Sequence, residues 1–167
     1  MKIADLLLAD YDHEIENTRR TLALIPADKG DFKPHEKSMP MGRLAEHTAR
    51  MGEFGNMVMN TEDMDLATAK WPEFHFNGPE QLLKHLQESS SQLKQTLNAM
   101  SDEDLEKVWT MRFGNKIIIQ APKYLVFRTM FLNHLVHHRA QLGVYLRLLN
   151  LPVPGLYGPS ADEPFQP

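Results

Sequence analysis

Two histidines four residues apart, His134 and His138, are the side chains of this sequence best spaced for metal chemistry. They lie between Pro122 and Leu149, where apolar residues recur every three or four positions, and this period predicts one long helix. Side chains at positions i and i+4 of a helix lie one turn apart on the same face. Both imidazoles can therefore point at one divalent ion.

A third histidine, His47, stands in the apolar row of another predicted helix, which begins at Ser38 and ends near Asn60. A lone histidine on such a row is more often a core residue satisfied by hydrogen bonds. Three buried imidazoles in one helical core are costly unless each has a partner. A metal held by three histidines with one open position meets that demand, and this is the ligand set of a catalytic zinc site.

The histidine pair lies on a row predicted to face the interior of a helical bundle: Phe127, Phe131, His134, His138, Gln141, Tyr145 and Leu148. His137 is about 100° around the helix from His138 and lies on a less apolar row. It is predicted to face a helix edge or solvent.

Two neighbours of the pair are candidate catalytic residues. Gln141, one turn beyond His138, is placed to orient a bound ligand, and a core amide bonded to a neighbouring helix is an equal alternative. Arg139 is placed to pair with a substrate carboxylate, or structurally with Asp162 or Glu163. The structural ion pair is the favoured alternative for Arg139.

The sequence supplies no obvious general base. Leu135 and Val136 stand where a metalloprotease helix would carry a glutamate, so peptide hydrolysis is disfavoured. Transfer to or from a thiol fits better, because coordination by a metal is enough to generate the thiolate. Glu46 and Asp162 are alternative acceptors for the second N–H group of a ligand histidine.

Composition narrows the class of protein. The 167 residues, 42% hydrophobic and 24% charged, predict one domain over residues 1–167. The absence of cysteine excludes disulfides, thiolate metal sites and a cysteine nucleophile. A net charge of -4 without a basic stripe argues against nucleic acid as a partner. No run of 18 apolar residues or signal peptide is evident, so we expect a cytoplasmic protein that does not enter membranes.

Periodicity and turn residues predict a mainly helical chain with a small hairpin before the last helix. The expected elements are helices over Ile3–Ile25, Ser38–Asn60, Pro79–Ala99 and Pro122–Leu149, a capped turn at Ser101–Asp104, and strands Val108–Phe113 and Lys116–Gln120 around Gly114-Asn115. Ser38 is the expected N-cap of the second helix, with Pro40 in its first turn. Thr61–Pro79 is expected to be irregular, and the proline-rich tail from Leu151 to pack back over the helices.

Three parts of the sequence together resemble the DinB-like family of damage-inducible bacterial proteins: Leu44-Ala45-Glu46-His47, the phrase His134-x-x-His137-His138-Arg139-x-Gln141, and the tail Pro154–Asp162. The resemblance implies an all-α four-helix bundle with a long crossover connection, often dimeric. It also implies that His47, His134 and His138 bind zinc or nickel. Some relatives are S-transferases or isomerases that use a small cofactor thiol, and others are assigned only as metal-dependent hydrolases.

These observations lead to two hypotheses. The first is a divalent-metal-dependent enzyme acting on a small molecule, as a thiol-dependent S-transferase or by related transfer or hydrolysis chemistry. The second is a non-catalytic metal- or ligand-binding protein of the stress response. A fourth protein ligand would favour the second, and an open position beside a cavity the first. Methionines and apolar residues on the second and fourth helices predict a homodimer.

Overall fold

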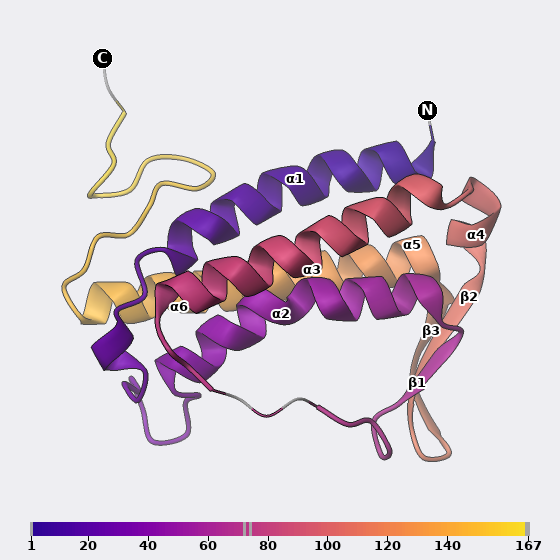
Figure 1. Cartoon of the computed structure of the whole chain (residues 1–167), viewed down its shortest axis with the longest axis horizontal. Coiled ribbons are helices and arrows are strands. Elements are labelled where there is room, and N and C mark those ends of the chain that lie inside the picture. Colours follow the sequence, from indigo (N-terminus) through magenta and orange to yellow (C-terminus); the bar gives the residue numbers. More distant parts are fainter. Residues whose placement is uncertain (1, 72, 74, 166–167) are drawn as a thin grey trace.

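The computed structural model describes residues 2–71, 73 and 75–165, and it is predominantly helical (Figure 1). Its longer helices are α1 (Ile3–Leu22), α2 (Met41–Asn60), α3 (Pro79–Ala99) and α6 (Asn133–Leu148). Shorter pieces are the 3-10 turn η1 (Ala27–Lys29), α4 (Asp102–Glu106), α5 (Lys123–Val126) and the π-helical segment η2 (Phe127–Leu132). Three strands, β1 (Asp63–Asp65), β2 (Val108–Phe113) and β3 (Lys116–Pro122), complete the fold.

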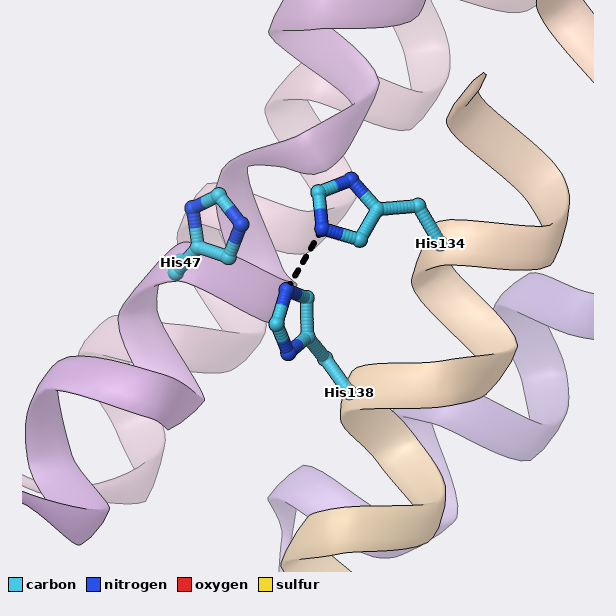
Figure 2. Close-up of side chains that lie close together, drawn as sticks. All are labelled: His47, His134 and His138. Atoms are coloured by element: carbon cyan, nitrogen blue, oxygen red, sulfur yellow. Dashed lines mark hydrogen bonds between the residues drawn. The ribbon is translucent and has the colours of Figure 1, made fainter. Parts of the chain in front are cut away.

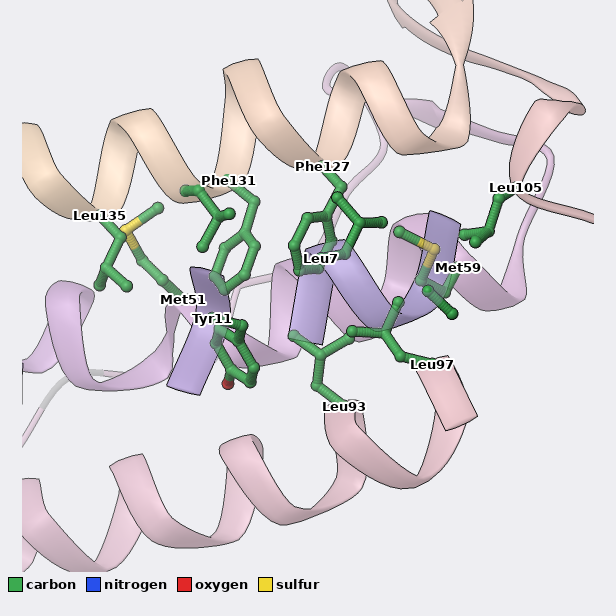
Figure 3. Packing of buried hydrophobic residues seen from close by; sticks show 12 residues of the cluster. Leu7, Tyr11, Met51, Met59, Leu93, Leu97, Leu105, Phe127, Phe131 and Leu135 are labelled. Carbon is green, nitrogen blue, oxygen red and sulfur yellow. The ribbon is translucent and has the colours of Figure 1, made fainter. Parts of the chain in front are cut away.

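The four long helices lie alongside one another (Figure 1), with α2 packed on α3 and α6, and α1 packed on the same two helices. Gly52 lets α2 approach α3 closely, because a Cβ atom there would lie 2.8 Å from the Ser89 hydroxyl. One buried cluster, shown in Figure 3, joins these helices through Tyr11, Leu93 and Phe131. A second cluster nearer the other end contains Leu44, Leu142 and Tyr145.

The predicted hairpin is confirmed, and it belongs to a larger sheet. Strand β2 pairs antiparallel with β3, and β1 pairs parallel with the other side of β2. Strand β1 was not predicted, because its three residues Asp63-Met64-Asp65 carry no strand-forming pattern. They are held instead by polar contacts, because the Asp65 carboxylate accepts the Gly114 N–H at 2.9 Å and pairs with Arg112. The Thr61–Pro79 connection is therefore partly ordered by the sheet.

The last predicted helix is interrupted, which corrects the expectation of one regular helix from Pro122 to Leu149. Strand β3 continues to Pro122, and six residues, Phe127–Leu132, then form a π-helix between α5 and α6. A π-turn takes about one more residue than an α-turn. Every side chain after this segment is therefore turned relative to the row that a continuous α-helix would give.

Several predicted boundaries hold and others shift. Ser101 and Asp104 form the expected capping box at the start of α4. Helix α3 begins at Pro79 as predicted, directly after Gly78, whose φ of 104° suits glycine. Helix α2 begins at Met41 with Pro40 as its N-cap, so the prediction of Ser38 in that role was wrong. Helix α1 ends at Leu22, three residues before the predicted Ile25.

The C-terminal tail packs back on the helices as predicted. Its carboxylates anchor it, because Asp162 pairs with Arg147 of α6 and Glu163 with Arg20 of α1. Pro72 and Phe74 of the connection and residues 166–167 of the tail fall within predicted irregular segments but lie outside the described residues. No helix in the described ranges is both long and apolar enough to cross a membrane.

Candidate metal centre

The three predicted histidines come together between α2 and α6. Figure 2 shows the imidazole of His47, from α2, pointing toward those of His134 and His138, from α6. One ring nitrogen from each residue lies within 4.8 Å of the others. Metal–nitrogen bonds are about 2.0–2.1 Å long, so the three nitrogens must draw closer together when all of them bind one ion.

Two ring nitrogens of the α6 pair face each other. His138 Nδ1 lies 2.8 Å from Gln141 Oε1, which can only accept, so Nδ1 of His138 carries the proton. The Nε2 atom of His138 is then unprotonated, and it lies 2.7 Å from His134 Nε2 in a hydrogen bond whose proton belongs to His134. A metal ion that replaces this proton can bind both Nε2 atoms, so the donor set fits a metal ion.

His47 closes the third side of the cluster. Its ring centroid lies 4.7 Å from that of His138 and 5.5 Å from that of His134. Although part of its side chain faces solvent, burial of the ring lowers the pKa of His47 to about 4, and the neighbouring histidines lower it further. The imidazole is therefore neutral near pH 7, which is the form that binds metals.

The other two histidines are biased the same way. Burial is the largest cause lowering the pKa of His134, followed by the charges that His138 and His137 would carry. Burial also lowers the pKa of His138, against the hydrogen bond to Gln141, which raises it. All three candidate ligands thus favour the neutral state over the cationic one.

The cluster lies at the edge of the core and not inside it, which corrects the predicted burial. His47 is exposed, His134 and His138 are half-buried, and Leu148 at the end of the predicted row is 55% exposed. The residues that α6 buries are instead Leu135, Arg139, Leu142 and Leu146, together with Tyr145 of the predicted row. The π-helical segment explains the difference, since it turns α6 so that the histidine row comes to the rim.

A cavity of about 430 Å³ opens beside His47 and His134. One side of the cavity is formed by residues of α2, which include Glu46 and Arg50. The facing side is formed by the connection after α2, by strand β2 and by the π-helical segment. Five methionines line it: Met39, Met51, Met64, Met111 and Met130. A mainly apolar cavity next to convergent polar groups is the usual form of a small-molecule site.

Comparison with known proteins agrees with this geometry. The sequence model of the DinB superfamily matches residues 10–142, which include all three histidines. The chain belongs to the DinB superfamily. A search of curated proteins found no match.

Solved DinB-like structures share the fold. One from Bacillus cereus is 20% identical, with a TM-score of 0.69 and coverage of 90% of this chain and 95% of the other. One from Bacillus subtilis is 17% identical, also with a TM-score of 0.69, over 89% of this chain and 96% of the other. At such identities the likeness concerns the fold, and the chemistry must be argued from the residues of this DinB protein.

Gln141 provides the hydrogen bond that a metal-ligating histidine usually needs. It fixes the orientation of His138. Asp162, one predicted alternative for this role, pairs with Arg147 at the protein surface. Glu46, the other, lies 3.3 Å from Arg50. Gln141 was predicted to orient a bound ligand or to be a core amide bonded to a neighbouring helix, and its contact with His138 was not predicted.

Arg139, the other candidate catalytic residue, is 1% exposed and lies in a separate polar network. Its guanidinium donates to the Glu14 carbonyl at 2.9 Å, to the Glu14 carboxylate and to Tyr157 of the tail. The predicted pairing with Asp162 or Glu163 was wrong, since those residues bind other arginines. Arg139 is absent from the lining of the cavity beside the histidines.

His137 lies outside the cluster, as its row predicted. It is exposed, and its ring centroid is 5.0 Å from that of His138. Its charge would lower the pKa of both His134 and His138. The structure thus distinguishes two of the three α6 histidines as candidate ligands.

Proposed function

We propose that this DinB protein is a divalent-metal-dependent enzyme acting on a small molecule, by thiol-dependent S-transfer or a related transfer or hydrolysis. The observation that carries the proposal is the convergence of three imidazoles, with the Nε2 atoms of His134 and His138 2.7 Å apart, His47 beside them and a cavity of about 430 Å³ at the cluster. Zinc and nickel both suit three imidazole ligands.

Each residue has a defined part in this chemistry. His47, His134 and His138 would hold the ion, and Gln141 holds His138 in the tautomer that leaves Nε2 unprotonated. A bound divalent ion supplies the charge that lowers the pKa of a thiol or water at its open position. The apolar walls of the cavity limit the access of bulk water to the reacting groups.

Two features favour catalysis over the alternative of a non-catalytic binding protein. The cluster contains three candidate protein ligands among the described residues, which matches the ligand count of catalytic sites with an open position. The cavity adjoins two of these ligands, His47 and His134, so a substrate held there lies next to the ion.

For the fold, we propose that the four long helices form a four-helix bundle with a long crossover connection.

The proposal is tested by assaying the purified, metal-loaded protein for S-transfer from several low-molecular-weight thiols to a set of electrophiles. We expect turnover with at least one thiol, and loss of that turnover in His134→Ala. The variant His137→Ala, which changes a neighbouring exposed histidine, should keep it. Equal turnover in wild type and His134→Ala would contradict the proposal.

A further inference from the structure

One carboxylate in the cavity is incompletely satisfied. Glu46 of α2 is 5% exposed and lines the cavity. Its Oε1 atom has a contact of 3.3 Å with Arg50, and its Oε2 atom is buried with no hydrogen-bond partner among the described residues. A buried acceptor without a partner costs about 1–3 kcal/mol, so such a group needs an explanation.

Arg50 compensates Glu46 only in part, because it is shared with a second carboxylate. Its Nε and Nη2 atoms both donate to Glu53 at 2.9 Å, in the two-bond geometry that arginine forms with a carboxylate. Only Nη1 reaches Glu46, at the longer distance of 3.3 Å. Two carboxylates therefore share one guanidinium, and Glu46 Oε2 is left to accept from another cation.

The carboxyl group of Glu46 lines the cavity and can offer its unpartnered oxygen to a ligand there. Its last side-chain torsion is soft, so a partial rotation can turn this oxygen toward the cavity. One oxygen can then stay with Arg50 while the other meets a ligand. Glu46 does not belong to the cluster of three histidines close enough together to share an ion, so we look to a molecule in the cavity for the missing partner.

The opposite walls of the cavity are apolar. Met64 and Leu66 of the connection, Met111 of β2 and Met130 of the π-helical segment face the space above α2. Methionine side chains adapt to ligands of varied shape and contact aromatic rings favourably. Strand β1 holds part of this wall in place, since it pairs with β2 and Asp65 is bonded to Gly114.

We propose that the cavity binds a small molecule with an aliphatic or aromatic body and a primary ammonium group, the body lying on the methionines and the ammonium pairing with Glu46. The inference rests on the proposed function in taking this cavity as the substrate site. To the proposed function it adds the chemical class of the substrate and a residue, Glu46, that selects it.

The test uses three probes of one shape on the metal-loaded protein: 3-phenylpropylamine, 3-phenylpropanol and 3-phenylpropionate. Calorimetry measures their affinities, and the methionine methyl signals in NMR spectra locate the binding. We expect the amine to bind ~10-fold or more tightly than the alcohol or the acid, as a charge-assisted hydrogen bond allows. It should shift the methyl signals of Met64 and Met111.

Glu46→Gln keeps the shape of the side chain and removes its charge, so it should weaken amine binding ~10-fold and leave the alcohol unchanged. Glu16→Gln, which removes the charge of an exposed glutamate paired with Arg19 and absent from the lining of the cavity, is the control and should leave the preference for the amine in place. Binding of the three probes with equal affinity, or loss of the metal in Glu46→Gln, would overturn the inference.

The two proposals fail separately. Absence of S-transfer with every thiol, together with a preference for the amine, would reject the enzymatic function and leave the ammonium site standing. Turnover without any preference for the amine would reject the ammonium site alone. If Glu46→Gln does not fold, the relative affinities of the three probes for the wild-type protein still decide the question.

Discussion

Two polar groups that adjoin each other on α6 differ in how their hydrogen bonds are satisfied. Arg139 is buried, and both terminal nitrogens of its guanidinium donate to groups of the chain, namely Glu14, Thr18 and Tyr157. The imidazole of His138, one residue earlier, faces that of His134, with their Nε2 atoms 2.7 Å apart. The first group is held by partners within the chain, whereas the ring nitrogens of the second are placed to bind a cation from outside it.

The hydrogen-bond partners of a polar residue, and not its burial, indicate whether it stabilises the fold or binds a ligand. The Tyr157 hydroxyl donates to Glu14 at 2.6 Å, and burial raises the pKa of this tyrosine to about 12. This network therefore joins α1, α6 and the tail through partners within the chain. By the same reasoning, the histidine cluster and Glu46 are where ligands are expected.

The largest expected effect on stability comes from breaking the complete network. Arg139→Met should lower the free energy of unfolding by about 3 kcal/mol, because it leaves Glu14 without its buried partner. Metal content should stay that of the wild type. Urea unfolding of Arg139→Met and of Arg147→Met, which breaks an exposed ion pair worth at most about 1 kcal/mol, provides the comparison. Similar decreases in the free energy of unfolding in both variants would show that the Arg139 network contributes no more than an exposed ion pair.

Removal of the metal should have a moderate effect. Each of the two buried clusters packs several helices together, so the chelated protein should keep its helical circular dichroism and a cooperative transition. Chelation should lower the free energy of unfolding only by the stabilisation that metal binding provides, which is about 2.7 kcal/mol when the metal is at 100 times its Kd. Loss of helical signal at room temperature after chelation would make the ion a structural element and weaken the catalytic proposal.

A smaller effect is expected from the residue that orients His138. Gln141→Leu removes the bond to Nδ1 and should weaken metal binding about 10–100-fold without removing a ligand. Competition with a chromogenic chelator measures this, and His137→Ala serves as the control. Unchanged affinity in Gln141→Leu would show that the tautomer of His138 is set by something else.

The smallest expected effect is the pH dependence of the free energy of unfolding of the metal-free protein. The pKa of His47 is about 4 when folded and near 6.5 when unfolded, so the unfolded state binds the extra proton first. Stability should be complete above pH 6.5 and fall as the pH drops toward 4. The effect is small because the side chain is partly exposed. Urea titrations should show a flatter pH dependence in His47→Gln, and an equal slope would contradict the assignment.

The long helices, the hairpin and the three histidines could be predicted because each leaves a local pattern in the sequence. Periodicity marks the helices, Gly114-Asn115 marks the turn, and the spacing of His134 and His138 survives any rotation of α6. The π-helical segment has no such pattern, and without it the exposure of the histidines could not be deduced. Strand β1 and the partners of Arg139 depend on contacts between distant segments, as with Asp65 and Glu14.

The most direct test of the central claim, that His47, His134 and His138 form a metal centre, is elemental analysis of purified protein and four variants. We expect about one divalent ion per chain in the wild type, in His137→Ala and in Arg139→Met, and almost none in His134→Ala and His138→Ala. Equal metal loss in His137→Ala and His134→Ala, or a wild type that binds no ion when divalent metals are supplied, would contradict the account.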